Sequence, residues 1–271
     1  MDIYISITPK FFIRRPIEVI REFQKCDVNK VIKGFELYFD LGIKEHVAFA
    51  KDFASMCSKE GYELQFHNDC VYDLERQKAY LEFVSAFSRM FDGKLMPVVF
   101  HTVYGDDILE NVRRTSEFMS DLLEYVYQKD LKVILSVENL DDKTWTVRLD
   151  KSEMREIIYN NENLYFTYDV GNEIIEYGNI TDVDYLLERR MINIHLHTFD
   201  KYDKHVPIYE NDEHKLRWLK ALTYLKLINY RGPICLEYEY NIIPGKTFEE
   251  KIRNTVISAE FVDLHLEHDE Y

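Results

Sequence analysis

Several features that would point directly to a function or a compartment are absent from this sequence. The four cysteines, Cys26, Cys57, Cys70 and Cys235, lie far apart and form no CxxC pair, which is typical of reduced thiols in a cytosolic protein. No apolar run approaches the roughly 20 residues that a membrane span needs. After Met1 the chain continues Asp-Ile-Tyr-Ile-Ser-Ile, without the basic segment and apolar stretch of a signal peptide. We therefore expect a cytoplasmic protein with no membrane partner.

Positive charge and glycine-rich turns are also scarce. Lysine and arginine number 34 against 49 aspartates and glutamates, which gives a formal net charge of −15. Broad contact with nucleic-acid backbones normally requires a basic surface, so nucleic acid is not an expected partner, although a local site stays open. The first apolar run continues as Ile-Ser-Ile-Thr-Pro-Lys without a glycine. An open dinucleotide-binding sheet usually has a glycine-rich turn at this point.

What the sequence does contain is a regular alternation of short apolar runs and longer amphipathic segments. The runs predict eight strands, at residues 3–7, 34–39, 62–67, 95–101, 131–138, 164–169, 192–197 and 233–237. Helices are expected from residue 16 and near 44–59, 74–90, 108–129, 151–159, 183–189, 213–229 and 248–266. Such alternation implies parallel strands with right-handed crossovers, and eight units in about 250 residues match a (β/α)8 TIM barrel. We predict a single α/β domain over residues 1–271.

Six consecutive predicted strands end in a histidine or a carboxylate after an apolar run. The terminal residues are His67, His101, Glu138, Asp169, the pair His195 and His197, and Glu237. Residues two apart on a strand point the same way, so the two histidines of the seventh strand share one face. Because barrel chemistry lies at the carboxyl ends of the strands, we expect these side chains to converge on one mouth. Glu36 is left open, as either a satisfied polar strand residue or a site residue.

The predicted mouth gathers negative charge that needs compensation. Glu138, Asp169 and Glu237 follow runs without lysine or arginine. Like charges brought together away from water raise one another's pKa and cost several kcal/mol unless a cation compensates. A divalent metal would do so, and imidazole nitrogen with carboxylate oxygen suits Zn²⁺, Mn²⁺, Co²⁺ or Fe²⁺ better than Ca²⁺. Protonated carboxylates, or pairing with a loop lysine such as Lys201 or Lys204, are the alternatives.

At this point the chain resembles the xylose isomerase-like TIM barrel superfamily, which contains sugar isomerases and epimerases and the endonuclease IV-type AP endonucleases. The matching segments are Val-Glu138-Asn, Asp169-Val-Gly-Asn, His197-Thr-Phe-Asp200 and Leu-Glu237. The resemblance implies that Glu138, Asp169, His197 and Glu237 hold the catalytic ion, such as Mn²⁺, Zn²⁺, Co²⁺ or Mg²⁺. The aspartate three residues after His197 selects it over His195, which then lines the site.

Other histidines also have counterparts in the resemblance. His67 and His101 match residues that bind a further zinc in the endonuclease branch or contact substrate in sugar-acting members. Asp203-Lys-His205 is similar to a segment that helps hold a third zinc in the endonuclease branch. That third site also uses a histidine three residues after the strand-six aspartate, where this chain has Asn172. This departure argues against a complete trinuclear site.

The resemblance implies metal-dependent isomerisation or epimerisation of a small sugar or a related polyhydroxy carbonyl compound, through an enediolate-like intermediate. Glu138 and Glu237 would be the catalytic base and acid. Substrate-binding roles are expected for His67, His101, Asn172, His195 and His205. A dehydratase, a zinc-dependent AP endonuclease and a non-catalytic barrel remain alternatives. The expected partner is a carbohydrate-like small molecule, and a homo-oligomer is compatible with the sequence.

Overall fold

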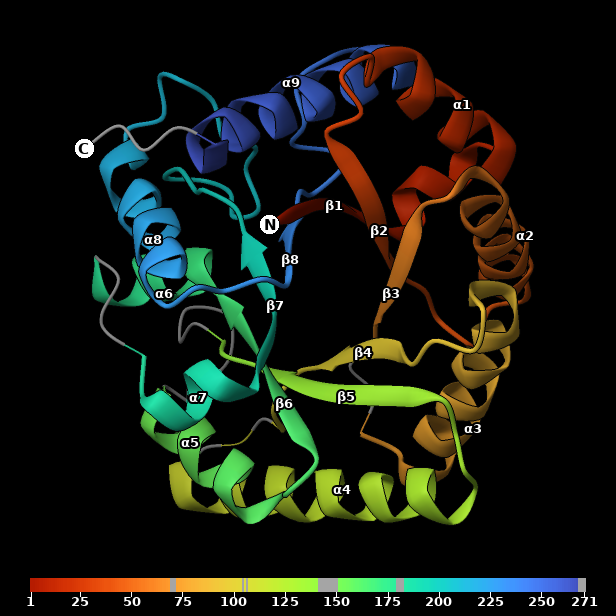
Figure 1. Ribbon diagram of the computed structural model, residues 1–271, viewed down its shortest axis with the longest axis vertical. Coiled ribbons are helices and arrows are strands. Elements are labelled where there is room, and N and C mark those ends of the chain that lie inside the picture. The colour runs from red at the N-terminus through yellow and green to blue at the C-terminus, as the bar shows by residue number, and fades with distance from the viewer. Residues whose placement is uncertain (69–71, 104, 106, 141–150, 179–182, 268–271) are drawn as a thin grey trace.

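The described residues form a closed barrel of eight parallel strands (Figure 1). The computed structural model describes residues 1–68, 72–103, 105, 107–140, 151–178 and 183–267. The strands are β1 Asp2–Ile7, β2 Ile32–Tyr38, β3 Glu63–His67, β4 Met96–Phe100, β5 Val133–Glu138, β6 Leu164–Asp169, β7 Met191–Leu196 and β8 Pro233–Leu236. Each strand pairs with its neighbours in the sequence, and β8 pairs with β1. The predicted (β/α)8 fold is therefore confirmed.

Helices surround the barrel on its outside (Figure 1). They are α1 Pro16–Cys26, α2 Lys44–Glu60, α3 Leu74–Ser85, α4 Ile108–Gln128, α5 Lys151–Asn160, α6 Val170–Tyr177, α7 Tyr185–Arg190, α8 Lys215–Leu227 and α9 Phe248–Glu267. Two 3-10 helices, η1 Pro9–Ile13 and η2 Ala86–Phe91, complete the elements. In the described part of the chain, no helix is both long and apolar enough to cross a membrane.

The two faces of each strand differ in chemistry because successive side chains point to opposite sides. On β5, Leu135 and Val137 belong to the hydrophobic core between strands and helices, whereas Ser136 and Glu138 are the buried polar residues that alternate with them. On β7, Ile194 and Leu196 belong to this core. The barrel is thus held to its helices by an apolar outer face, while its interior is polar.

The structure departs from the predicted element boundaries at several strand ends. Strands β4, β7 and β8 end one residue earlier than expected, so His101, His197 and Glu237 lie just beyond them. Helix α6 was not predicted and begins directly after Asp169. The Asp169 carboxylate caps it by accepting a 2.7 Å hydrogen bond from the backbone N–H of Asn172. An aspartate at this position stabilises a helix start, and this local signal outweighs the helix-weakening Gly171.

Candidate metal centre at the barrel mouth

The polar residues predicted for the strand ends do meet at the carboxyl-terminal mouth of the barrel. Glu138, Asp169 and His195 are 2%, 0% and 0% exposed. One ligand atom from each of these three residues and one from Glu237 all lie within 4.8 Å of one another. Four strands therefore deliver three carboxylates and an imidazole to one small volume shielded from water.

A second group of potential ligands lies on the β3–β4 side of Glu138. His67 Nε2 and His101 Nε2 lie 3.4 and 3.5 Å from Glu138 Oε2. The two imidazoles are 3.2 Å apart through their Nε2 atoms. The three side chains qualify as a metal-holding set in their own right, so Glu138 lies between two possible cation positions.

A third group forms on the β7–β8 side. His197 Nε2 lies 3.3 Å from Asp169 Oδ1, and His205 Nδ1 lies 3.4 Å from Glu237 Oε2. The two imidazole rings are 4.3 Å apart. His205 adopts a left-handed backbone conformation with φ of 55°, which is uncommon for a residue other than glycine. Its loop is held by the antiparallel bridge between Thr198 and Val206.

The donor atoms of these groups fit a divalent cation. Several of them are buried without a hydrogen-bond partner, namely Glu138 Oε2, Asp169 Oδ2, His195 Nδ1, His197 Nε2, His205 Nδ1 and Glu237 Oε2. Buried polar atoms are normally satisfied, and leaving one unsatisfied costs about 1–3 kcal/mol. Unsatisfied imidazole nitrogens and carboxylate oxygens that converge are the donor set of a transition-metal site.

Histidines lie against the three carboxylates, and these contacts act together with burial on the pKa of each carboxylate. Burial raises the pKa of Glu138, but His195, His101 and His67 outweigh it and hold this pKa well below its usual range. Burial likewise raises the pKa of Glu237, and His195 and His205 lower it well below the ordinary value. For Asp169, burial prevails and its pKa is raised despite His197. Imidazole groups therefore lie against all three of these carboxylates.

Asn172, a predicted substrate-binding residue, is hydrogen-bonded to the chain just after β5. Asn172 is 6% exposed, and its side-chain amide donates a 3.1 Å hydrogen bond to the Asn139 carbonyl. The Asn139 amide in turn donates to the Asp169 carbonyl and accepts from the Asp169 backbone N–H. Together the two asparagines lock the end of β5 to the end of β6 and fix Asp169. The sequence did not predict that Asn139 links the ends of β5 and β6, although the residue belongs to the Val-Glu-Asn motif.

Gly171 is a second residue whose role the sequence did not reveal. A Cβ atom at this position would lie 2.2 Å from His197 Cε1 and 2.4 Å from Nε2, which no real contact allows. The start of α6 therefore approaches the imidazole so closely that only glycine fits. The glycine in the Asp169-Val-Gly-Asn motif was the available signal.

A pocket of about 390 Å³ opens beside the histidines on the mouth side of the barrel. It is lined by Ser6, Thr8, Pro9, Lys10, Tyr38, His67, His101, Glu237 and Glu239. Lys10 forms an ion pair with Glu239 at this pocket. The volume suits a small polar molecule with one side against Glu237.

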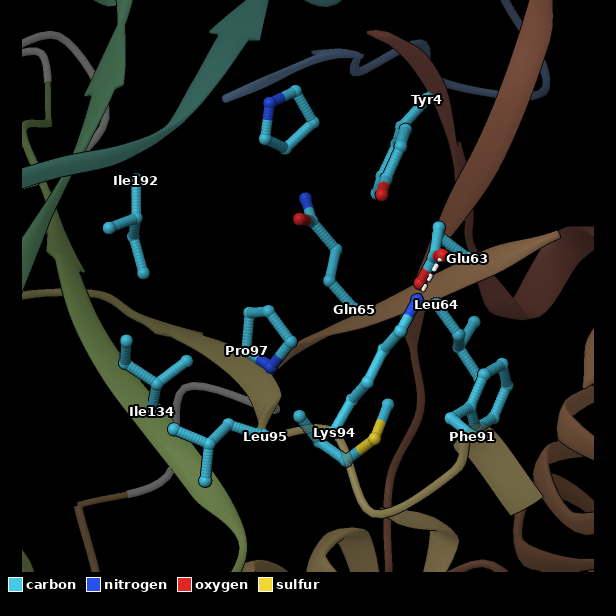
Figure 2. Close-up of a pocket in the computed structure, with 12 residues that line it drawn as sticks. Tyr4, Glu63, Leu64, Gln65, Phe91, Lys94, Leu95, Pro97, Ile134 and Ile192 are labelled. Atoms are coloured by element: carbon cyan, nitrogen blue, oxygen red, sulfur yellow. Dashed lines mark hydrogen bonds and ion pairs between the residues drawn. The ribbon is translucent and has the colours of Figure 1, made fainter. Parts of the chain in front are cut away.

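A smaller pocket of about 190 Å³ lies at the opposite, amino-terminal end of the barrel. Figure 2 shows its lining, in which Pro97, Ile134 and Ile192 are each the second residue of a strand and Gln65 points into the space between them. The side chains around it are mostly apolar, and no cluster of carboxylates and histidines is found among its lining residues.

Fold and mouth together define a class of protein, the parallel (β/α)8 barrels that collect carboxylates and histidines at the carboxyl ends of their strands. The chain belongs to the family of xylose isomerase-like TIM barrels, whose model matches residues 32–257. The resemblance seen in the motifs is thereby confirmed. No curated protein sequence matches the chain.

Solved structures with the same fold include several sugar epimerases. A D-tagatose 3-epimerase-like protein is 18% identical with a TM-score of 0.70, and the match covers 98% of this chain and 97% of that one. A D-psicose 3-epimerase from Clostridium cellulolyticum H10, solved with D-tagatose, is 11% identical with a TM-score of 0.71 and coverage of 99% and 100%. An L-ribulose 3-epimerase is 13% identical with a TM-score of 0.65 and coverage of 97% and 94%. At these identities the likeness establishes the fold.

Proposed function

We propose that the protein is a metal-dependent isomerase or epimerase of a small sugar or a related polyhydroxy carbonyl compound. The observation that carries the proposal is the group of buried, unsatisfied donor atoms that Glu138, Asp169, His195, His197 and Glu237 offer at the mouth. Glu138, Asp169, His195 and Glu237 each offer a ligand atom within 4.8 Å of the others, and His197 lies against Asp169. Membership of the xylose isomerase-like family supports it. The sugar epimerases among the structures of the same fold support the substrate class.

In this proposal Glu138, Asp169, His197 and Glu237 hold the divalent ion, which is Mn²⁺, Zn²⁺, Co²⁺ or Mg²⁺. When bound, such an ion polarises carbonyl and hydroxyl oxygens and stabilises negative charge that develops on them. Glu138 and Glu237 are the proposed catalytic groups because they come from β5 and from just beyond β8, which are not neighbouring strands, so the two carboxylates reach the site from different directions. One removes the proton from the carbon beside the carbonyl and the other returns a proton to the intermediate.

The pocket next to the centre is the proposed substrate site. His67 and His101 line it together with Glu237, so their imidazoles can orient substrate hydroxyl groups. From the sequence, His205, His195 and Asn172 remain proposed as substrate-binding residues; they are not among the residues that line this pocket, and His195 and Asn172 are 0% and 6% exposed. Because Lys10 is already paired with Glu239 at this pocket, the pocket does not favour an anionic substrate, and we propose an uncharged polyol or ketose.

The proposal is tested with purified protein in two steps. Elemental analysis of the wild type, Glu138→Gln and Glu237→Gln should show a divalent metal in the wild type and a reduced content in both variants. The metal-loaded protein is then incubated in D₂O with a panel of ketoses, and deuterium incorporation beside the carbonyl is followed by NMR. Glu63→Gln, the same substitution at the other end of the barrel, is the matched control. Unchanged metal content in both mouth variants, or no turnover of any ketose, would contradict the proposal.

A second candidate is a phosphodiesterase of the AP endonuclease type. The separate group formed by His67, His101 and Glu138 favours it because that group offers a place for an additional ion. Asn172 in place of a histidine and the net charge of −15 oppose it. Three bound zinc ions per chain together with nicking of abasic duplex DNA would favour this alternative, whereas at most two ions and no nicking would exclude it.

A dehydratase is the remaining alternative, since it also begins by removing a proton beside a carbonyl. The NMR assay distinguishes it, because a dehydratase produces a compound that has lost water. Cytoplasmic localisation and assembly into a homo-oligomer remain proposals that subcellular fractionation and light scattering would test.

A further inference from the structure

The interior of the barrel beneath the mouth contains a buried carboxylate that the proposed mechanism does not use. Glu36 on β2 is 0% exposed. Its Oε2 atom accepts hydrogen bonds from Gln65 Nε2 at 2.7 Å and from Asn193 Nδ2 at 3.2 Å. It also lies 3.0 Å from His195 Nε2. These partners come from β3 and β7, so the contacts cross the inside of the barrel.

A buried carboxylate is costly unless its oxygens are hydrogen-bonded or paired. Gln65 and Asn193 supply N–H donors to Glu36, and the imidazole of His195 is a third group in contact with the same oxygen. Figure 2 shows Gln65 at the pocket of the amino-terminal end, so the amide supports Glu36 from the side away from the mouth. Glu36 and His195 therefore form a buried pair, and Gln65 donates a hydrogen bond to Glu36 from the side away from the mouth.

The opposite edge of the His195 ring faces the proposed catalytic groups. His195 Nδ1 lies 3.3 Å from Glu138 Oε1 and 3.3 Å from Glu237 Oε2, and it has no hydrogen bond aligned with either. The imidazole is thus held by one carboxylate from below and lies equally far from two carboxylates above. A shift of this ring would change the distance to both of them at once.

We propose that Glu36 is a positioning residue which, acting through His195, fixes the orientation of the imidazole beneath Glu138 and Glu237 and so sets the rate at which they transfer protons. The inference rests on the proposed function of those two glutamates. Catalytic groups need to be held within narrow limits of distance and angle by residues around them. Replacing such an outer residue typically costs about 10–100-fold in activity or metal affinity.

The variant Glu36→Gln tests the proposal because it keeps the size of the side chain and removes its charge. We expect kcat to fall about 10- to 100-fold, with KM changed by less than about threefold, since Glu36 does not line the substrate pocket. Metal content per chain should stay at the wild-type value. Ser136→Ala is the matched control, because Ser136 is a buried polar residue of the interior whose hydroxyl bonds to Thr167 instead of the Glu36 network. Its kcat should stay within about twofold of the wild type.

A double-mutant cycle separates action through His195 from a general structural role. On a His195→Asn background, Glu36→Gln should have little further effect on kcat, because coupled residues are non-additive. The same cycle is measured on the urea unfolding midpoint of chelated protein, which does not depend on activity. Glu36→Gln should lower that midpoint in the wild-type background and lower it much less when His195 is already replaced.

Each result decides the matter. Equal kcat for Glu36→Gln and the wild type, or additive losses in the cycle, would overturn the inference while leaving the proposed function intact. If Glu36→Gln does not fold, Glu36→Asp replaces it, and a kcat closer to the wild type than that of His195→Asn is expected because the charge is kept. Failure of the wild type to turn over any ketose would overturn the proposed function, and the catalytic part of this inference with it.

Discussion

The two ends of the barrel handle charge in opposite ways. At the carboxyl-terminal mouth, Glu138 and Asp169 are buried and face histidines. At the amino-terminal end, Glu63 pairs with Lys94, whose side chains are 44% and 57% exposed, and the pocket beside them is lined mostly by apolar residues (Figure 2). An exposed pair contributes about 0–1 kcal/mol, whereas buried unpaired charges cost several.

The contrast indicates that the amino-terminal end serves the stability of the fold and that the mouth serves binding and catalysis. At the amino-terminal end, the ion pair of Glu63 and Lys94 lies at the surface, where its charges remain in contact with water. The mouth concentrates unsatisfied donor atoms from several strands, and such an arrangement opposes folding unless a ligand is bound. Substitutions at the mouth should therefore affect metal binding and turnover, and substitutions at the other end should affect stability alone.

The largest expected difference is in turnover. Glu138→Gln or Glu237→Gln should lower kcat by about 10³-fold, because each removes a group that transfers a proton. The same substitution at the other end, Glu63→Gln, should leave kcat within about twofold of the wild type. Steady-state kinetics on the ketose with the highest turnover provide the measurement. A comparable loss in Glu63→Gln would show that the two ends are not functionally distinct.

Two glycines offer a sharper comparison, because both are crowded and they lie at opposite ends. In Gly171→Ala the new Cβ would meet the His197 ring, and in Gly34→Ala it would meet Tyr4 and the Glu63 carbonyl, at 2.7–2.8 Å. Each should destabilise the protein by about 1–3 kcal/mol through overpacking. Only Gly171→Ala should also weaken metal binding, by at least about tenfold. Urea unfolding and calorimetric metal titration measure the two effects, and equal metal affinity in both variants would contradict the assignment of His197.

The pH dependence of the free energy of unfolding should also distinguish the mouth from the rest of the molecule. Burial lowers the pKa of His205, but Glu237 outweighs it and raises this pKa to about 9. A histidine with a raised pKa stabilises the folded state fully below its unfolded value of about 6.5, and this stabilisation is lost as the pH rises towards 9. Chelated protein should therefore lose stability between about pH 6.5 and 9, and His205→Gln should lose less.

Metal-loaded protein should behave in the opposite way, because protons compete with the ion for the same ligands. The urea midpoint, measured across this pH range with and without chelator, distinguishes the two states. A midpoint in chelated wild type that is flat or rises with pH would contradict the pairing of His205 with Glu237.

The smallest effects are expected at the exposed ion pairs. Lys94→Ala at the amino-terminal end and Lys10→Ala at the mouth should each change the free energy of unfolding by less than about 1 kcal/mol. Only Lys10→Ala should raise KM, by severalfold, since Lys10 lines the proposed substrate pocket. A KM that changes equally in both variants would remove Lys10 from the proposed substrate site.

The sequence by itself determined the order and number of the strands, because the apolar runs and the amphipathic segments between them are local patterns. It also determined that His67, Glu138 and Asp169 end their strands, and that the mouth would be rich in carboxylates and histidines. Helix α6 was missed because its only start signal, Asp169, was read as a strand end.

Closure of the barrel decided the rest, since it brings together residues that no local pattern connects. Glu36 and His195 lie 159 positions apart in the sequence and meet across the interior. The close approach of Gly171 to His197 and the bracket formed by Asn139 likewise depend on how neighbouring strands are staggered. The pairing of each histidine with a carboxylate depends on distances of a few ångströms between residues on different strands. These distances are fixed only when all eight strands are in place.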